Sequence, residues 1–177
     1  MLFETTEIHG LIAVWLQRHD DERGSFARLF CREEFAARGL VTDFVQESLS
    51  VTRRAGTVRG MHFQAGAHAE VKFVRCVRGA VFDVVADMRP DSPTYRRWQG
   101  FHLSADDDLA LYIPKGCAHG FQSLENDSEV LYQMDTPYAP LAAGGFRYDD
   151  PVYGIAWPRP VTMVAERDLA WPPLTNG

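Results

Sequence analysis

Short, mostly apolar runs separated by polar turn residues occupy much of the chain, and runs bounded in this way are typical of β-strands. Many of the apolar positions in these stretches hold β-branched or aromatic side chains. Strands are predicted over residues 71–77, 80–88, 110–113 and 129–135. Arg78-Gly79 predicts a turn between the first two, and Pro114 ends the third. Short strands separated by turn residues indicate a β-sandwich or a small barrel.

One segment, residues 31–40, has the features of a helix. It carries two glutamates early, two alanines in the middle and Gly39 as an end signal. No strand alternates with a long helix, and neither a GxGxxG nor a GxxxxGK[ST] motif occurs in the sequence. A doubly wound nucleotide-binding fold is therefore not expected.

Length and composition fit one globular domain spanning residues 1–177, with 46% hydrophobic and 24% charged residues. Fourteen glycines and ten prolines favour a loop-rich β fold over a helical bundle. The net charge of −6 argues against nucleic-acid binding. It is compatible with a small anionic ligand held by a local group of arginines.

The sequence predicts a cytoplasmic protein. Its first residues have neither the basic nor the apolar region of a secretory signal, and its most apolar stretch is interrupted by Asp83 and Asp87, so no membrane span is expected. Three separated cysteines, Cys31, Cys76 and Cys117, indicate reduced thiols. Without a CxxC pair, a thiolate zinc site is not expected.

Residues 57–64, with the sequence TVRGMHFQ, contain the first candidate for chemistry. Alternation places Gly60, His62 and Gln64 on one face and Arg59 on the other, unless Gly60 forms a bulge that redirects the strand. His62 lies between apolar neighbours. It is either a core histidine with one hydrogen bond, the more frequent case, or a general base.

Residues 112–121 contain the pattern P-x-G-x-x-H, which resembles the second motif of cupin barrels. The first cupin motif needs H-x-H followed by glutamate, whereas this chain has His62-x-Gln64. Only His62 and His119 remain as metal ligands, and two histidines without a carboxylate seldom hold a catalytic metal. We therefore expect a barrel without a metal.

Three further side chains are ambiguous taken singly. Lys72 in an apolar strand either reaches solvent from an edge or serves a site. Tyr132 shares an inward face with its apolar neighbours and fits a core tyrosine with its hydroxyl at the rim. Asp168 lies in a charge triplet that is usually solvated. Together with His62, these residue types match a proton-transfer site that needs no cofactor.

Several segments resemble the family of dTDP-4-dehydrorhamnose 3,5-epimerases and related nucleotide-sugar epimerases. The resemblance covers nearly the whole chain, and its most specific segments are Arg59-Gly-x-His-x-Gln64 and Ile113-Pro-x-Gly-x-Ala-His-Gly-Phe121. It also includes Asp21-x-Arg-Gly-x-Phe26, Gln46-x-x-x-Ser50, Lys72-x-Val, Arg89-x-x-Ser-Pro-Thr-Tyr95 and Ile155-x-Trp-Pro158. The family implies a cupin-type double-stranded β-helix (jelly-roll) barrel with a few short helices, all-β in class. It also implies a homodimer, with residues 1–30 as an arm at the interface.

The resemblance assigns a role to each matching residue. His62 is the general base with Asp168 as its carboxylate partner, Lys72 stabilises an enolate, and Tyr132 is the acid that protonates the opposite face. Substrate-binding positions are Arg23, Phe26, Arg28, Gln46, Arg59, His119, Tyr138 and Arg167. Of these, Arg59 and Arg167 match pyrophosphate-binding positions, as arginine suits a phosphate ester. The implied reaction is cofactor-free epimerisation, at carbon 3, carbon 5 or both, of a nucleotide-linked 4-keto-6-deoxyhexose, with dTDP as the expected carrier.

Three positions depart from the family pattern. Arg28 and Ala143 stand where rhamnose-pathway members have glutamate, and Ser48 stands where they have asparagine. The first two positions lie toward the nucleotide end, and recognition of the base and the sugar is expected to differ. Two alternatives remain open: a ketone-moving isomerase on the same barrel, and a cupin that binds a sugar nucleotide without catalysis.

Overall fold

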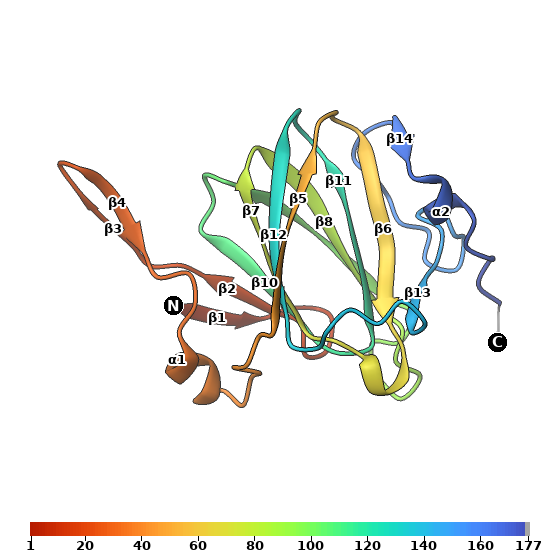
Figure 1. Cartoon of the computed structure of the whole chain (residues 1–177), viewed down its shortest axis with the longest axis horizontal. Helices are drawn as coiled ribbons and strands as arrows, with labels where there is room; N and C mark the ends of the chain where they lie inside the picture. Colours follow the sequence, from red (N-terminus) through yellow and green to blue (C-terminus); the bar gives the residue numbers. More distant parts are fainter. Residues whose placement is uncertain (176–177) are drawn as a thin grey trace.

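The computed structural model describes residues 1–175, and most of its regular structure lies in two antiparallel sheets that pack face to face (Figure 1). The first sheet has the order β1 (Leu2–Thr5), β2 (Ile12–Trp15), β10 (Leu109–Ile113), β7 (Lys72–Arg78), β12 (Ser128–Met134), β5 (Gln46–Thr52). The second has the order β13 (Ala143–Gly145), β6 (Thr57–Gln64), β11 (Cys117–Ser123), β8 (Ala80–Asp87), β9 (Trp98–Ser104), and β14 (Met163–Val164) joins β6 in parallel. The predicted all-β barrel is confirmed.

The apolar face of each sheet explains why the predicted strands form. In the core between the sheets, Val74, Leu111 and Val130 from the first pack with Val85 and Leu103 from the second. A second cluster covers the outside of the second sheet, where Phe146 and Tyr153 pack over Met61 and Val84. The four predicted strands are present, and no end is shifted by more than one residue.

The predicted helix is shorter than residues 31–40. Helix α1 spans Arg32–Ala36, and the chain then turns through Gly39, whose φ of +68° lies in the left-handed region that favours glycine. The Leu40 N–H donates to the carbonyl of Phe35 and closes the turn. Phe35 is fully buried and packs edge-on against Phe73 of the first sheet, so α1 covers the lower part of that sheet's outer face.

A two-stranded hairpin stands apart from both sheets. It consists of β3 (Arg18–Asp21) and β4 (Gly24–Ala27), and Figure 1 shows it projecting from the body on the side away from the C-terminus. Of the arm expected over residues 1–30, β1 and β2 lie in the first sheet and only this hairpin extends outward. Within residues 1–175, no helix is long and apolar enough to cross a membrane.

Candidate active site

A bulge in β6 brings two predicted site residues to one side of the strand. His62 pairs with His119 of β11 and Arg59 pairs with Phe121, so three steps along β6 match two along β11. The bulge lies at Gly60, where a Cβ atom would be 2.6 Å from the Cα of Gly120. Arg59 and His62 therefore line one cavity despite a spacing that simple alternation would separate. The bulge anticipated at Gly60 is confirmed.

The cavity lies between the two sheets and has a volume of about 280 Å³. A neighbouring cleft of about 450 Å³ shares five of its lining residues, so the two form one continuous site. The shared residues are His62, Lys72, Tyr132, Arg167 and Asp168. All four predicted catalytic side chains are thus brought together from different parts of the chain.

His62 and Asp168 form a hydrogen-bonded pair. The Nε2 atom of His62 lies 2.7 Å from Oδ1 of Asp168, which helix α2 (Glu166–Leu169) places beside β6. Asp168 is only 2% exposed, so it is not part of a solvated triplet. Burial by itself raises the pKa of this carboxyl, but the hydrogen bond and charge of His62 and the Gly60 N–H outweigh burial and lower it. Asp168 therefore remains ionised and orients the imidazole.

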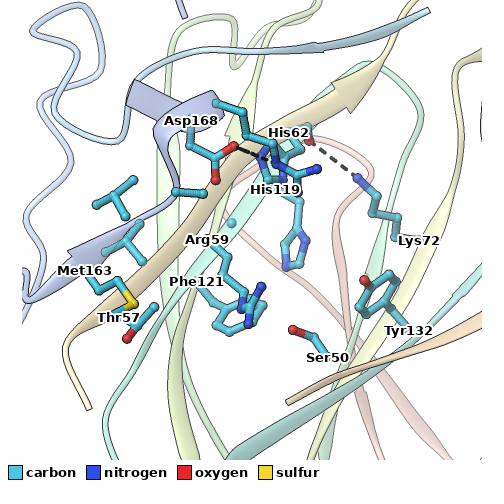
Figure 2. A pocket seen from close by; sticks show the side chains of 15 residues that line it. Ser50, Thr57, Arg59, His62, Lys72, His119, Phe121, Tyr132, Met163 and Asp168 are labelled. Carbon is cyan, nitrogen blue, oxygen red and sulfur yellow. Dashed lines mark hydrogen bonds and ion pairs between the residues drawn. The ribbon is translucent and has the colours of Figure 1, made fainter. Parts of the chain in front are cut away.

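Lys72 and Tyr132 enter the cavity from the first sheet, opposite His62 and Asp168 (Figure 2). The ammonium of Lys72 lies 3.1 Å from Oε1 of Glu70 and 3.4 Å from the carbonyl oxygen of His62. Burial raises the pKa of the Tyr132 phenol above its ordinary value, although Arg59 opposes this shift. Among residues 1–175, the Tyr132 hydroxyl has no hydrogen-bond partner. It remains a neutral proton donor that faces the cavity.

His119 has a carboxylate partner of its own. Its Nε2 atom lies 2.8 Å from Oδ2 of Asp83, and both side chains are buried. Within the described part of the chain, the other oxygen of Asp83 is buried without a partner. Each of the two histidines that line the cavity, on the adjacent strands β6 and β11, therefore has a carboxylate partner.

The residues predicted at the nucleotide end separate into two groups. Gln46, Tyr138 and Arg167 line the cleft, and the Tyr138 N–H donates to Oε1 of Gln46. Arg59 lines the cavity and donates to Thr52 and to the Val51 carbonyl.

Three expected binding residues are not brought to the site within one chain. Arg23 lies at the hairpin tip, ion-paired with Asp21, and Phe26 and Arg28 border a separate depression near the N-terminus. Arg28 faces Glu34 there, with 3.8 Å between the charged atoms. Alternation of apolar and polar residues predicts the position of a side chain only within a sheet. It therefore does not place the residues of this hairpin, which belongs to neither of the two main sheets.

The side chains at the position of the cupin metal site form hydrogen bonds within the protein. Nε2 of His62 and of His119 each bonds a carboxylate, and the amide of Gln64 bonds Glu70 and the backbone at His68, Pro137 and Ala139. Across residues 1–175, no three His, Cys, Asp or Glu side chains gather as metal ligands would.

Sequence reasoning missed two residues of the site, Glu70 and Asp83. Asp83 interrupts an apolar strand, and a carboxylate buried in such a strand must have a partner, so its position was a usable signal. Glu70 lies outside any predicted strand and carries no such signal.

The barrel and its histidine-bearing cavity define a cupin-type protein with residues suited to proton transfer, and the comparisons with known proteins narrow this class. The family model described as dTDP-4-dehydrorhamnose 3,5-epimerase matches residues 5–176, and the chain belongs to this family of isomerases. The dTDP-4-dehydrorhamnose 3,5-epimerase of Sinorhizobium fredii is 38% identical over 175 residues, covering 98% of this chain and 90% of the relative.

Two further relatives show the range of the family. The dTDP-4-dehydrorhamnose 3-epimerase of Streptomyces niveus is 36% identical over 162 residues, covering 91% of this chain and 78% of the relative. A crystal structure of the Bacillus anthracis 3,5-epimerase with TDP and PPi bound has a TM-score of 0.94 at 33% identity, covering 98% of this chain and 99% of that one. The predicted family, fold and class of enzyme are confirmed.

Proposed function

We propose that this epimerase inverts carbon 3, carbon 5 or both of a dTDP-linked 4-keto-6-deoxyhexose, with His62 as base and Tyr132 as acid. The observation that carries the proposal is the arrangement of the four catalytic candidates. His62 faces the cavity from one sheet, with Asp168 of α2 beside it, and Lys72 with Tyr132 faces it from the other sheet.

The chemistry follows from these positions. A C–H beside a ketone is a weak acid, so His62 removes the proton while Lys72 donates a hydrogen bond to the oxygen of the forming enolate. Asp168 holds the imidazole in place and stabilises the imidazolium. Tyr132 then gives its proton to the opposite face of the carbon, which inverts the centre. Water afterwards restores the phenol and takes the proton from His62, so no electrons are exchanged with a cofactor.

The cleft suits the nucleotide diphosphate. Arg167 borders both the cavity and the cleft, so a pyrophosphate between sugar and base lies within its reach. Gln46, Ser48 and Tyr138 line the part of the cleft that would take the nucleoside. The ligands in the Bacillus anthracis relative, TDP and PPi, support this assignment.

A second copy of the chain is proposed as the partner that the hairpin meets. Phe26 on β4 is 69% exposed, and an isolated hairpin is only marginally stable in water. On β5, Leu49 and Val51 point away from the cavity and are about half exposed. Docking of a second copy covers these apolar side chains and brings Arg23, Phe26 and Arg28 towards a neighbouring cleft.

Three free thiols support a cytoplasmic location.

Turnover of dTDP-4-keto-6-deoxyglucose tests the proposal. The purified protein should convert this sugar to an epimer, and NMR of the product identifies the inverted carbons. Activity should survive exhaustive chelation, since Gln64 stands at the position of a second metal ligand. Binding without conversion, ketone migration, or loss on chelation with rescue by one divalent ion would each contradict the proposal.

A further inference from the structure

The ammonium of Lys72 makes two contacts with the protein. Its Nζ atom forms an ion pair of 3.1 Å with Oε1 of Glu70 and donates a hydrogen bond of 3.4 Å to the His62 carbonyl. The Lys72 side chain is 11% exposed and borders both the cavity and the cleft. One donor therefore remains for a ligand, and the two protein contacts determine where it points.

Glu70 is itself held in place. Its second oxygen, Oε2, accepts a hydrogen bond of 3.1 Å from Nε2 of Gln64, and its side chain is also 11% exposed. The side chain of Gln64 in turn accepts a hydrogen bond of 2.6 Å from the N–H of Ala139 and donates to the backbone carbonyls of His68 and Pro137. Both carboxylate oxygens of Glu70 are thus committed, one to the rigid end of β6 and one to Lys72.

A lysine side chain needs fixed partners more than most residues do if its ammonium is to point in one direction. Its ammonium is a point charge on a flexible four-carbon stem, so it acquires a fixed direction only from its partners. The carbonyl contact at 3.4 Å is too long to fix it alone. The ion pair with Glu70 is mostly shielded from water, and it is the stronger of the two contacts.

We propose that Glu70, anchored by Gln64, is the positioning residue that aims the free donor of Lys72 at the enolate oxygen. This inference rests on the proposed role of Lys72. It goes further by placing part of the transition-state stabilisation in a carboxylate that does not touch the substrate.

A spectroscopic test is available because the chain has two lysines, Lys72 and Lys115. Protein labelled with ¹³C at the lysine ε-carbon should give two ε-methylene signals, assigned with K115R. The Lys72 signal should show two inequivalent protons, as expected for an immobilised side chain. In E70A these protons should become equivalent, while the Lys115 signal should stay unchanged.

Kinetics of the same variants provide the functional readout. E70A should lower kcat by about a hundredfold, the loss expected for a misplaced group, with little change in KM. E70Q keeps an acceptor without the charge, so its kcat should lie between those of E70A and the wild type. E70Q also provides the kinetic test if E70A folds poorly. The matched control is E129Q, which removes the Glu129–Arg78 pair outside the site and should leave kcat and both signals unchanged.

The outcomes separate the two proposals. If the wild type converts the substrate and both E70A and E70Q keep the wild-type kcat, the proposed role of Glu70 is wrong, whereas the proposed function stands. Lowered kcat with an unchanged Lys72 signal would also overturn the role of Glu70. Absence of wild-type turnover would instead show that the proposed function is wrong.

Discussion

His62 and Tyr132 approach the cavity from opposite sheets, and each has surroundings suited to its proposed part in proton transfer. Asp168 has a lowered pKa and stays charged beside His62, whereas burial raises the pKa of the Tyr132 phenol. The site therefore holds a base supported by a carboxylate on one wall and a protonated acid on the other.

Replacing Tyr132 with phenylalanine removes the acid and leaves the base. Because the raised pKa keeps Tyr132 protonated up to at least its ordinary value of 10.0, its titration should not limit wild-type activity below that pH. In Y132F, inversion should slow by roughly 10²–10⁴-fold, the usual contribution of a general acid. Exchange of the substrate proton with deuterium oxide should continue from the His62 side. Product stereochemistry by NMR measures this, and normal inversion by Y132F would show that another group is the acid.

Ala143 lines the cleft but has no polar side-chain atom, and Arg28 can only donate hydrogen bonds. A nucleobase that lacks one hydrogen-bond partner in the cleft loses about 1–3 kcal/mol of binding free energy, which is roughly tenfold or more in affinity. Calorimetry with dTDP, UDP, CDP and GDP should therefore show weak discrimination, and A143E should increase the preference for dTDP. A wild-type preference for dTDP above about a hundredfold would contradict this prediction.

Positions in the site were predictable where a motif or an apolar setting marked them. His62 and Lys72 lie in segments that resemble the family, Tyr132 shares an inward face with its apolar neighbours, and Gly60 offered a bulge as one of two arrangements of its strand. Burial of Asp168 was not predictable from its charged neighbours, because the contacts that bury it come from β6, more than a hundred residues earlier. Glu70 was missed for a different reason: its partners Lys72 and Gln64 are near in sequence, but Glu70 lies outside any predicted strand, so no pattern marked it.

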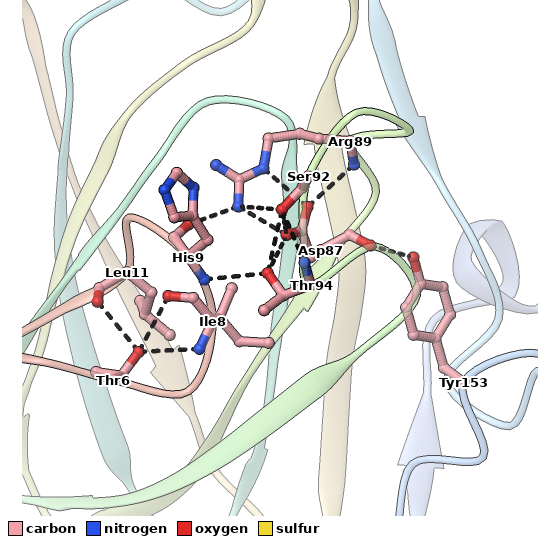
Figure 3. Close-up of polar contacts among 9 residues, drawn as sticks. All are labelled: Thr6, Ile8, His9, Leu11, Asp87, Arg89, Ser92, Thr94 and Tyr153. Carbon is pink, nitrogen blue, oxygen red and sulfur yellow. Dashed lines mark hydrogen bonds and ion pairs between the residues drawn. The ribbon is translucent and has the colours of Figure 1, made fainter.

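At the scale of elements, the end of β8 is fastened by one buried carboxylate. Asp87 accepts bonds from Arg89, Ser92 and Thr94 at 2.5–3.0 Å, and the backbone N–H of His9 donates to Thr94 (Figure 3). Burial by itself raises the pKa of Asp87, but these bonds outweigh burial and hold the pKa well below its ordinary value. One side chain thus joins the loops after β1 and β8.

Replacing Asp87 with asparagine should destabilise the fold by about 3 kcal/mol at neutral pH, since Arg89 loses its charged partner. The folded-state pKa of Asp87 is lowered, so its contribution is complete above the ordinary value of 3.8 and is lost as the pH falls below it. Urea unfolding at several pH values should show the difference between wild type and D87N shrinking below pH 3.8. D91N, an exposed change in the same loop, is the control. A difference that stays constant down to acid pH would contradict the assignment.

Elements with one buried face were predictable, and those without one were not. The strands β7, β8 and β10 consist mostly of buried residues and appear as apolar runs, whereas every residue of β3 and most of β4 are exposed, so no apolar run marks them. The predicted helix at residues 31–40 was too long because its last residues form a turn through Gly39.

At the scale of the whole molecule, the exposed hairpin and the apolar outer face of β5 predict a dimer. Sedimentation at micromolar concentration should give a dimer for the wild type. L49E places a charge on the proposed interface and should dissociate it, with loss of activity as the partner's hairpin leaves the cleft. L141E, at a fully exposed leucine away from the sheet face, should remain dimeric and active. A fully active wild-type monomer would contradict the prediction.

The role of His62 as the base that removes the substrate proton is tested by comparing solvent exchange in H62A with that in the wild type. In deuterium oxide, the wild type should place deuterium at carbon 3, carbon 5 or both of dTDP-4-keto-6-deoxyglucose, as located by NMR. H62A should give no exchange at either carbon while keeping the wild-type circular dichroism and dTDP affinity. Exchange by folded H62A at near wild-type rate would show that another residue removes the proton.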